Sequence, residues 1–467
     1  MNAFDRRDFL KTCATGALTA GLVPGARLAF GQTEANNYDT IVVVYLRGGC
    51  DGLSLIPPIS GNDRSHYEAA RPTLRIPVSG NGAAFALANS DSPQATWGLH
   101  PRAAKLNTLY QQNKLAVVIG AGMPHPVTRS HFDAQQTMEY GTPGATGIGS
   151  DWLTRHLASA GLPANITIPA LSAGSITANS LVASTESVTM GNGGDFKLDW
   201  SAWNWNHRDR YSGGAPNGFL GQVERLPELW AGNSALEAAG RQTLDALSIV
   251  RPMNFGNYAP ANGAVYPTDN FGNQLKMIAQ LLKADLGLRV AAIDLASWDT
   301  HNGQGVPTNS YDPFGILVQS LSDGLGAFYQ DLNGTGANNF AQRTSIIVMS
   351  EFGRRLRMNG SGGTDHGYGN VMMVLGGSVN GGQVYGRQQF AGLVGEALFE
   401  GEDVQVTVDF RRVLSEALIR RAGNNHLGYI FPGYANYSPL GIFQGTDLPP
   451  DYSNDFDRLF AHGFEAA

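Results

Sequence analysis

The side chains that could do chemistry gather in five short clusters of this 467-residue chain. The clusters are Gly48-Gly49-Cys50-Asp51-Gly52, Arg129-Ser130-His131, Asp299-Thr300-His301, Ser350-Glu351-Phe352-Gly353 and Thr364-Asp365-His366-Gly367. Together they offer carboxylates, imidazoles and a serine hydroxyl. Carboxylates and imidazoles bind hard-to-borderline divalent metal ions, and a hydroxyl beside such an ion can attack a phosphoryl or sulfuryl group. No other stretch of the chain suggests a chemistry.

Most of these clusters follow a predicted buried strand or lead into one. Continuous apolar runs, which are typical of parallel strands covered on both faces, occur at residues 40–46, 115–119, 288–295, 344–349 and 370–375. Helical patterns lie between or after them, at residues 130–140, 273–286, 314–332 and 410–422. Strands alternating with helices predict an α/β sandwich with a mostly parallel central sheet.

Carboxylates and imidazoles after these strands are candidate metal ligands, because ligands of open α/β sheets bind beyond the carboxyl ends of the strands. Asp51 follows the first run, Asp299 and His301 follow the third, and Glu351 follows the fourth. His366 lies in a glycine-rich loop. Taken alone, Asp51 could equally belong to a turn, and a single buried carboxylate is usually paired for structural reasons. The clusters taken together favour metal or anion chemistry at one end of the sheet.

Ser130 opens a predicted helix and is flanked by Arg129. A serine in this position is often only an N-cap. The same position also gathers backbone N–H groups and the positive end of the helix dipole, which suit an anionic tetrahedral group. We therefore consider Ser130 a candidate nucleophile and Arg129 a candidate catalytic residue beside it.

The N-terminus carries a targeting signature, Arg6-Arg7-Asp8-Phe9-Leu10-Lys11. A weakly apolar stretch at 13–23 follows, too short to span a bilayer. We interpret residues 1–31 as a twin-arginine signal peptide, which implies the twin-arginine translocase as partner and a periplasmic or extracellular mature protein. The alternative is an N-terminal helix with a chance arginine pair. No later apolar run is long enough for a transmembrane segment.

Composition excludes some partners. The formal net charge is -7, from 39 acidic and 32 basic residues without a basic stripe, so nucleic acid is not an expected partner. Of the two cysteines, only Cys50 would remain after cleavage, so the mature chain has no intramolecular disulfide. Residues 36–445 are predicted as one α/β domain. Within it, 144–266 reads as a cap or insertion, or as loops packed on the core, and 446–467 as a mobile tail.

The order of strand–Asp, helix-opening Ser, Asp/His, acid after a strand and Gly-rich His loop resembles the alkaline phosphatase-like superfamily. More closely, residues 42–55, 128–139, 297–304 and 348–377 look like an uncharacterised family called domain of unknown function 1501, whose members are twin-arginine-exported bacterial proteins. The resemblance extends over residues 38–433. It implies an alkaline phosphatase-like three-layer sandwich with a mostly parallel central sheet.

Carried over to this chain, the superfamily pattern implies one metal ion on Asp299, His301 and His366. A second ion would bind Asp51 and Glu351, with Ser130 touching it as the nucleophile, and Arg129 would hold the non-bridging oxygens of the substrate. The implied cofactors are divalent metal ions (Zn, Mg, Ca or Mn), one or two per chain. The implied substrate is an anionic small-molecule or glycan ester.

The chain also departs from the superfamily pattern. Glu351-Phe352 stands where these hydrolases usually have Asp-His, and the spacing of Asp299 and His301 is tighter than usual. One metal, altered ligands such as His131, or a degenerate site are the alternatives. The resulting hypothesis is an exported metal-dependent hydrolase of phosphate or sulfate esters acting through a Ser nucleophile. Its rival is a non-catalytic periplasmic or surface binding protein.

Overall fold

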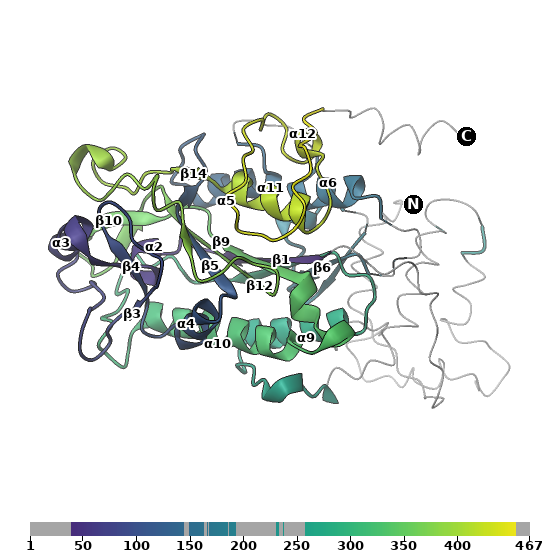
Figure 1. Ribbon diagram of the computed structural model, residues 1–467, viewed down its shortest axis with the longest axis horizontal. Coiled ribbons are helices and arrows are strands. Elements are labelled where there is room, and N and C mark those ends of the chain that lie inside the picture. Colours follow the sequence, from purple (N-terminus) through teal and green to yellow (C-terminus); the bar gives the residue numbers. More distant parts are fainter. Residues whose placement is uncertain are drawn as a thin grey trace, which may run out of the picture.

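A computed structural model describes residues 39–143, 149–162, 166, 168–184, 186–192, 230–232, 237 and 257–453. In this part of the chain a central sheet lies between two layers of helices (Figure 1). The predicted signal peptide, most of the predicted cap at 144–266 and the end of the predicted tail lie outside the described residues. The α/β sandwich with a mostly parallel sheet, predicted from the sequence, is confirmed.

The central sheet has the strand order β13-β5-β12-β9-β1-β8-β6-β7, with β14 also paired to β5. The strands are β1 (Thr40–Leu46), β5 (Leu115–Gly122), β6 (Ala170–Ala173), β7 (Ser187–Met190), β8 (Val290–Leu295), β9 (Thr344–Met349), β12 (Asn370–Gly376), β13 (Val384–Tyr385) and β14 (Val408–Asp409). β1 lies between β9 and β8 and is parallel to both. All five predicted strands therefore exist, with boundaries at or close to the predicted ones.

β12 differs from the prediction in its direction. Its apolar run was expected to form a parallel strand, but it is antiparallel to both β5 and β9. Six of its seven residues are buried, because both faces of the sheet are covered by helices. A continuous apolar run therefore reports burial on two faces and does not distinguish strand direction.

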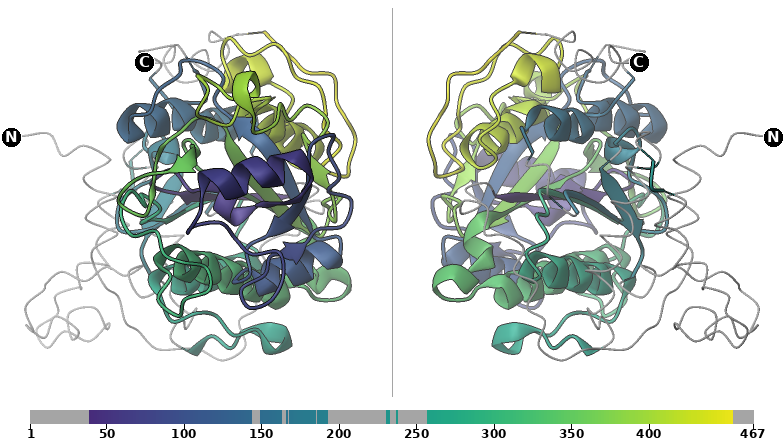
Figure 2. Two further views of the ribbon diagram at one scale, coloured as in Figure 1. Left: turned by 90° about the vertical axis from the view of Figure 1, so that its left-hand side faces the viewer. Right: turned by 90° about the vertical axis from the view of Figure 1, so that its right-hand side faces the viewer.

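One helical layer consists of α4 (Ala104–Gln111), α9 (Asn270–Lys283) and α10 (Pro313–Leu332). The other consists of α5 (His131–Tyr140), α6 (Trp152–Ser159), α11 (Phe410–Arg420) and α12 (Leu427–Ile430). The two end-on views in Figure 2 show these layers above and below the sheet. None of the described helices combines the length and apolar character that crossing a bilayer requires.

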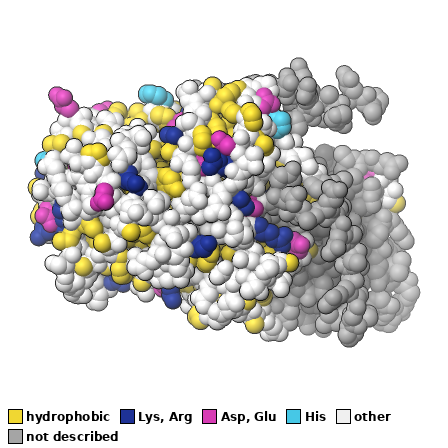
Figure 3. All heavy atoms as spheres, viewed as in Figure 1, with side chains coloured by type: hydrophobic (Ala, Val, Ile, Leu, Met, Phe, Trp, Pro, Cys, Tyr) yellow, Lys and Arg dark blue, Asp and Glu magenta, His cyan; other side chains and the backbone are white. Residues whose placement is uncertain are grey.

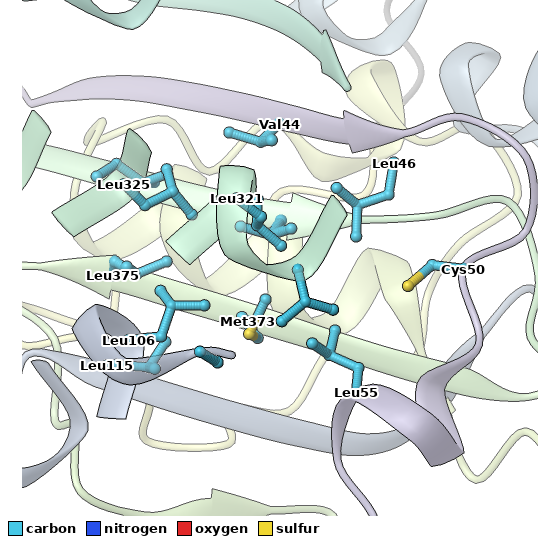
Figure 4. Close-up of a cluster of buried hydrophobic side chains, with 14 of the residues drawn as sticks. Val44, Leu46, Cys50, Leu55, Leu106, Leu115, Leu321, Leu325, Met373 and Leu375 are labelled. Atoms are coloured by element: carbon cyan, nitrogen blue, oxygen red, sulfur yellow. The ribbon is translucent and has the colours of Figure 1, made fainter. Parts of the chain in front are cut away.

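Alternation along β1 divides the core into two halves. Val42 and Val44 pack in the cluster with α4, α9 and α10, whereas Ile41 and Val43 pack in the cluster with α5, α6 and α11. Figure 4 shows part of the first half, where Leu321 of α10 lies among side chains of the sheet. With both faces of every central strand packed, the ends of the strands are where polar side chains can meet.

The remaining elements gather around one end of the sheet, at the left of Figure 1. They are α2 (Gly52–Leu55), α3 (Gly61–Ala70), β2 (Pro58–Ser60), β3 (Phe85–Ala86), β4 (Thr96–Leu99), β10 (Arg354–Met358) and β11 (Thr364–His366). β10 and β11 form a separate two-stranded antiparallel sheet. The loops that follow β1, β8 and β9 open toward these elements, so the predicted site clusters come from this end.

Candidate metal centre

Four side chains meet at one carboxylate oxygen, Oδ1 of Asp299. The Nε2 atoms of His301, His366 and His131 lie 3.2, 3.3 and 3.4 Å from it. Arg354 donates a hydrogen bond to the same oxygen from Nη2 at 2.6 Å. The ligand atoms of His131, Asp299 and His366 all lie within 4.8 Å of one another. This arrangement, hereafter the histidine cluster, comprises His131, Asp299, His301 and His366.

The histidine cluster is assembled from three distant segments. His131 is the first residue of α5, Asp299 and His301 lie in the loop after β8, and His366 ends β11. The backbones of these loops touch directly. At Gly48, whose φ is +120°, a Cβ atom would lie 2.5 Å from the Asp299 backbone nitrogen. At Gly363 a Cβ atom would collide with the carbonyl oxygens of Thr300 and His301.

Each imidazole is held on its far side by an oxygen. His131 Nδ1 lies 2.8 Å from Glu351 Oε1, and His301 Nδ1 lies 2.9 Å from Asp365 Oδ1. His366 Nδ1 lies 2.7 Å from the backbone carbonyl of Arg129. Ionised carboxylates and carbonyls only accept hydrogen bonds, so the Nδ1 atoms carry the protons. In the neutral tautomer, all three Nε2 lone pairs then face the cluster.

The inward-facing nitrogens contact one another and Asp299 Oδ1. The Nε2 atoms of His301 and His366 are 2.7 Å apart. Two unprotonated nitrogens at this separation repel unless a proton or a cation joins them. His131 Nε2 is buried and has no hydrogen-bond partner. Such unsatisfied atoms beside a carboxylate fit a metal ion, and the outward hydrogen bonds match the way metal-binding histidines are oriented.

The pKa shifts in the cluster favour an ionised Asp299. They also favour a proton on His131, with which a metal ion would compete. Burial raises the pKa of Asp299, but the hydrogen bond and charge of Arg354 and the nearby histidines lower it to about 2. Burial, aided by the positive charges of Arg354 and His131, lowers the pKa of His366, which favours its neutral imidazole. The hydrogen bond to Glu351 raises the pKa of His131. A metal ion would therefore have to displace a proton most readily held by His131.

Asp51 lies in a different network. Its Oδ2 accepts hydrogen bonds from Arg71 Nη1 at 2.5 Å and from Ser54 and Gln304, each at 2.7 Å. Both Asp51 and Arg71 have fully buried side chains. Burial raises the pKa of Asp51, but Arg71 and the two other donors lower it below the ordinary value. The guanidinium of Arg71 thus occupies one oxygen, Oδ2, of the carboxylate where a second metal ion was predicted, whereas Oδ1 is buried without a hydrogen-bond partner.

Glu351, the other predicted ligand of that second ion, has its own partners. Its carboxylate accepts hydrogen bonds from His131, Gln135, the Gly48 amide and Ser350. The structure therefore does not join Asp51 and Glu351 in one ligand set. Glu351 instead contacts Nδ1 of His131, on the side of the ring that faces away from Asp299.

Ser130 and Arg129 lie beside the histidine cluster, with different orientations of their polar groups. Ser130 precedes His131 and caps α5, accepting a hydrogen bond from the Asp133 amide at 3.4 Å. The guanidinium of Arg129 pairs with Asp403 and Glu400. Its backbone carbonyl, in contrast, holds His366. Ser130 thus adjoins His131 in the chain with its hydroxyl capping α5, whereas the Arg129 side chain is engaged by two carboxylates.

Phe352 forms an apolar wall behind the imidazoles. It is buried, with its ring centroid 4.8 Å from that of His131 and 4.9 Å from that of His366. Sequence reasoning treated Phe352 as a missing ligand and His131 only as an alternative one. It missed Gln135 entirely. The spacing could have indicated Gln135. His131 and Gln135 are positions i and i+4 of the same helix, and such residues lie on one face.

Comparison with protein families gives one match. Residues 234–420 match the model of a family described as protein of unknown function (DUF1501). Over these residues, the resemblance to this family that was predicted from the sequence is confirmed. The matched range contains Asp299, His301 and His366 but not His131. Among curated proteins, none matches the chain.

Solved structures show distant similarity. The crystal structure of Ps i-CgsB in complex with k-i-k-neocarrahexaose is 11% identical, with 83% of this chain and 72% of that chain covered and a TM-score of 0.34. A protein in the alkaline phosphatase superfamily from Vibrio parahaemolyticus is 9% identical, with 80% and 69% covered and a TM-score of 0.27. Both superpositions are loose, so the roles of single residues rest on the geometry of this chain.

Proposed function

We propose that this chain is a metal-dependent hydrolase that holds one divalent ion on His131, Asp299, His301 and His366. The observation that supports this most directly is the convergence of three Nε2 atoms on Asp299 Oδ1, each imidazole held from behind by an oxygen. Neutral imidazoles whose Nε2 lone pairs face one another repel unless a proton or a cation is shared among them, and three of them around a carboxylate suit a metal ion.

The donor set selects the class of ion. Three imidazole nitrogens and one carboxylate oxygen suit Zn²⁺ and neighbouring transition metals, whereas Mg²⁺ and Ca²⁺ prefer oxygen ligands. A bound ion of this class would polarise an ester oxygen and lower the pKa of a nucleophile. Asp299 contributes the negative charge, and Arg354 holds that carboxylate in place from the protein side.

Ser130 is the nucleophile of the proposal. It precedes a cluster ligand and sits at the N-terminus of α5, where the positive end of the helix dipole favours an anionic group. Phosphate and sulfate esters are the proposed substrate class, which comes from the sequence resemblance. On the basis of the twin-arginine motif at Arg6-Arg7, the proposal also includes export by the translocase. The mature protein would then be periplasmic or extracellular.

Metal analysis and turnover of aryl phosphate and aryl sulfate esters test the proposal. The mature chain, purified without chelator, should contain about one Zn²⁺ or similar ion per chain. Ser130→Ala should abolish turnover and keep the metal, whereas His366→Ala should lose both. Ser60→Ala, at the N-cap of α3, is the matched serine control and should change neither.

A non-catalytic metal-binding protein is the second candidate. The pairing of the Arg129 guanidinium with Asp403 and Glu400 favours it, because this arginine does not face an incoming anion. A metal-loaded wild type that turns over neither ester class would establish this reading. So would slow turnover that is identical in Ser130→Ala.

A further inference from the structure

Glu351 is a buried carboxylate with an unusual number of donors. It follows β9 by two residues, and its side chain has no exposed surface. Its two carboxyl oxygens accept hydrogen bonds from the Gln135 side-chain amide, the Gly48 backbone amide and the Ser350 hydroxyl. The group is therefore a carboxylate inside the protein. Burying a charge is costly unless it is fully hydrogen-bonded, so its partners indicate its purpose.

The partners leave little room for a metal ion. Oε1 accepts from His131 Nδ1 at 2.8 Å, Gln135 Nε2 at 2.7 Å and the Gly48 amide at 2.8 Å. Oε2 accepts from Ser350 Oγ at 2.9 Å. A carboxylate oxygen has about two lone-pair sites, so three donors saturate Oε1. Glu351 faces His131 from the side opposite the cluster.

The three outer acceptors of the histidine cluster are not equivalent. Asp365, behind His301, has a side chain that is 47% exposed, so water competes with it. The acceptor behind His366 is a neutral backbone carbonyl. Glu351 alone among these three combines a full charge with complete burial. Its hydrogen bond is consequently the strongest constraint on any of the three imidazoles.

The geometry points to Glu351 as the positioning residue that fixes the tautomer and ring orientation of His131, and not as a metal ligand. This inference rests on the proposed metal site. The carboxylate holds the proton on Nδ1, which leaves Nε2 free to face Asp299. Phe352 packs against the same ring and limits its rotation. Loss of an outer-shell partner of this kind typically costs roughly 10–100-fold in metal affinity.

Zn²⁺ and Co²⁺ binding to the metal-depleted mature chain tests the role of Glu351. Glu351→Gln keeps an acceptor for His131 and should weaken Zn²⁺ affinity by about 10-fold, whereas Glu351→Ala should weaken it by about 100-fold. Asp365→Asn is the matched control at the exposed anchor and should have a smaller effect than Glu351→Gln. The Co²⁺ visible spectrum of Glu351→Gln should match wild type, because no ligand is lost. His131→Ala should change that spectrum.

The outcomes separate the two proposals. A wild type that binds neither ion refutes the metal site itself. A wild type that binds, with unchanged affinity in both Glu351 variants, refutes only the positioning role. A Co²⁺ spectrum altered in Glu351→Gln as in His131→Ala would make Glu351 a ligand and overturn the inference. If Glu351→Ala fails to fold by circular dichroism, the spectrum and affinity of Glu351→Gln still decide.

Discussion

Asp51 and Asp299 follow neighbouring parallel strands, yet the protein uses the two carboxylates differently. β1 and β8 end at Leu46 and Leu295, which pair in register. Asp51 is fully buried against Arg71, whereas Asp299 has a side chain that is 48% exposed and meets three imidazoles. Each carboxylate also touches an arginine, so the imidazoles make the difference. The Arg71 guanidinium pairs with Asp51, whereas Asp299 also faces three imidazoles, whose inward lone pairs would accept a shared proton or a metal ion.

Breaking the Asp51 pair should have the largest effect on folding. Arg71→Met leaves a buried carboxylate without its countercharge and should lower the free energy of unfolding by about 3–5 kcal/mol. Arg75→Met, at an exposed arginine close in sequence, is the matched control and should stay within roughly 0.5 kcal/mol of wild type. Urea denaturation measures both. Equal stability of the two variants would show that Asp51 does not depend on Arg71.

Removing an imidazole should act on metal binding instead. His366→Ala should weaken Zn²⁺ affinity by more than the roughly 100-fold that loss of an outer partner costs, because it deletes a ligand. The metal-free variant should unfold within about 1 kcal/mol of wild type. His426→Ala, at a half-exposed histidine paired with Asp451, is the control. Unchanged Zn²⁺ affinity in His366→Ala would contradict the view that Asp299, unlike Asp51, belongs to a metal site.

The two carboxylates should also differ in how much each contributes to the loss of stability at low pH. The pKa of Asp51 is lowered in the folded state relative to its unfolded value of about 3.9, so its contribution to stability is complete above that value. The contribution is lost as the pH falls below about 4. Asp51→Asn should therefore flatten the fall in urea midpoint between pH 5 and pH 3.

Asp299→Asn should have a smaller effect than Asp51→Asn on the fall of the urea midpoint between pH 5 and pH 3. The pKa of Asp299 is also lowered, to about 2, but its half-exposed carboxylate is screened by water. Equal changes of slope in the two variants, measured without metal, would contradict the contrast in burial.

The smallest effect concerns the predicted second ion. Phe352→His adds an imidazole beside His131 and His366, but Arg71 still pairs with Asp51. We expect the metal content to remain at one ion per chain, as in Phe352→Leu, which controls for lost packing against His131. Metal analysis after Zn²⁺ loading measures this. A second ion bound by Phe352→His would mean that Asp51 can exchange its guanidinium for a metal.

Much of the fold and part of the candidate site were predictable from local sequence patterns. β1 and β9 have the predicted boundaries, because continuous apolar runs report strands covered on both sides. The predicted ligands Asp299, His301 and His366 lie together, since their clusters follow or precede strands at one end of the sheet. The direction of β12 was not predictable, because burial alone produced its pattern.

The partners of the buried carboxylates were also beyond local patterns. Arg71 reaches Asp51 across 20 residues and also donates to the backbone of β10, and no spacing rule specifies such a contact. Glu351 reaches His131 across 220 residues, so its role as anchor or ligand depends on which way one rotamer points. On the face shown in Figure 3, Lys and Arg side chains are interspersed with Asp and Glu side chains.

The glycines between the site loops bear on how this protein can vary. Gly48 and Gly363 bring backbone against backbone, so replacing either would push its own segment away from the loop that carries Asp299 and His301. The ligand side chains, by contrast, project from those loops and can be exchanged without moving them. Mutational drift should therefore alter the chemistry of this centre more easily than its dimensions. Among relatives, we expect donor identity to change while these glycines persist.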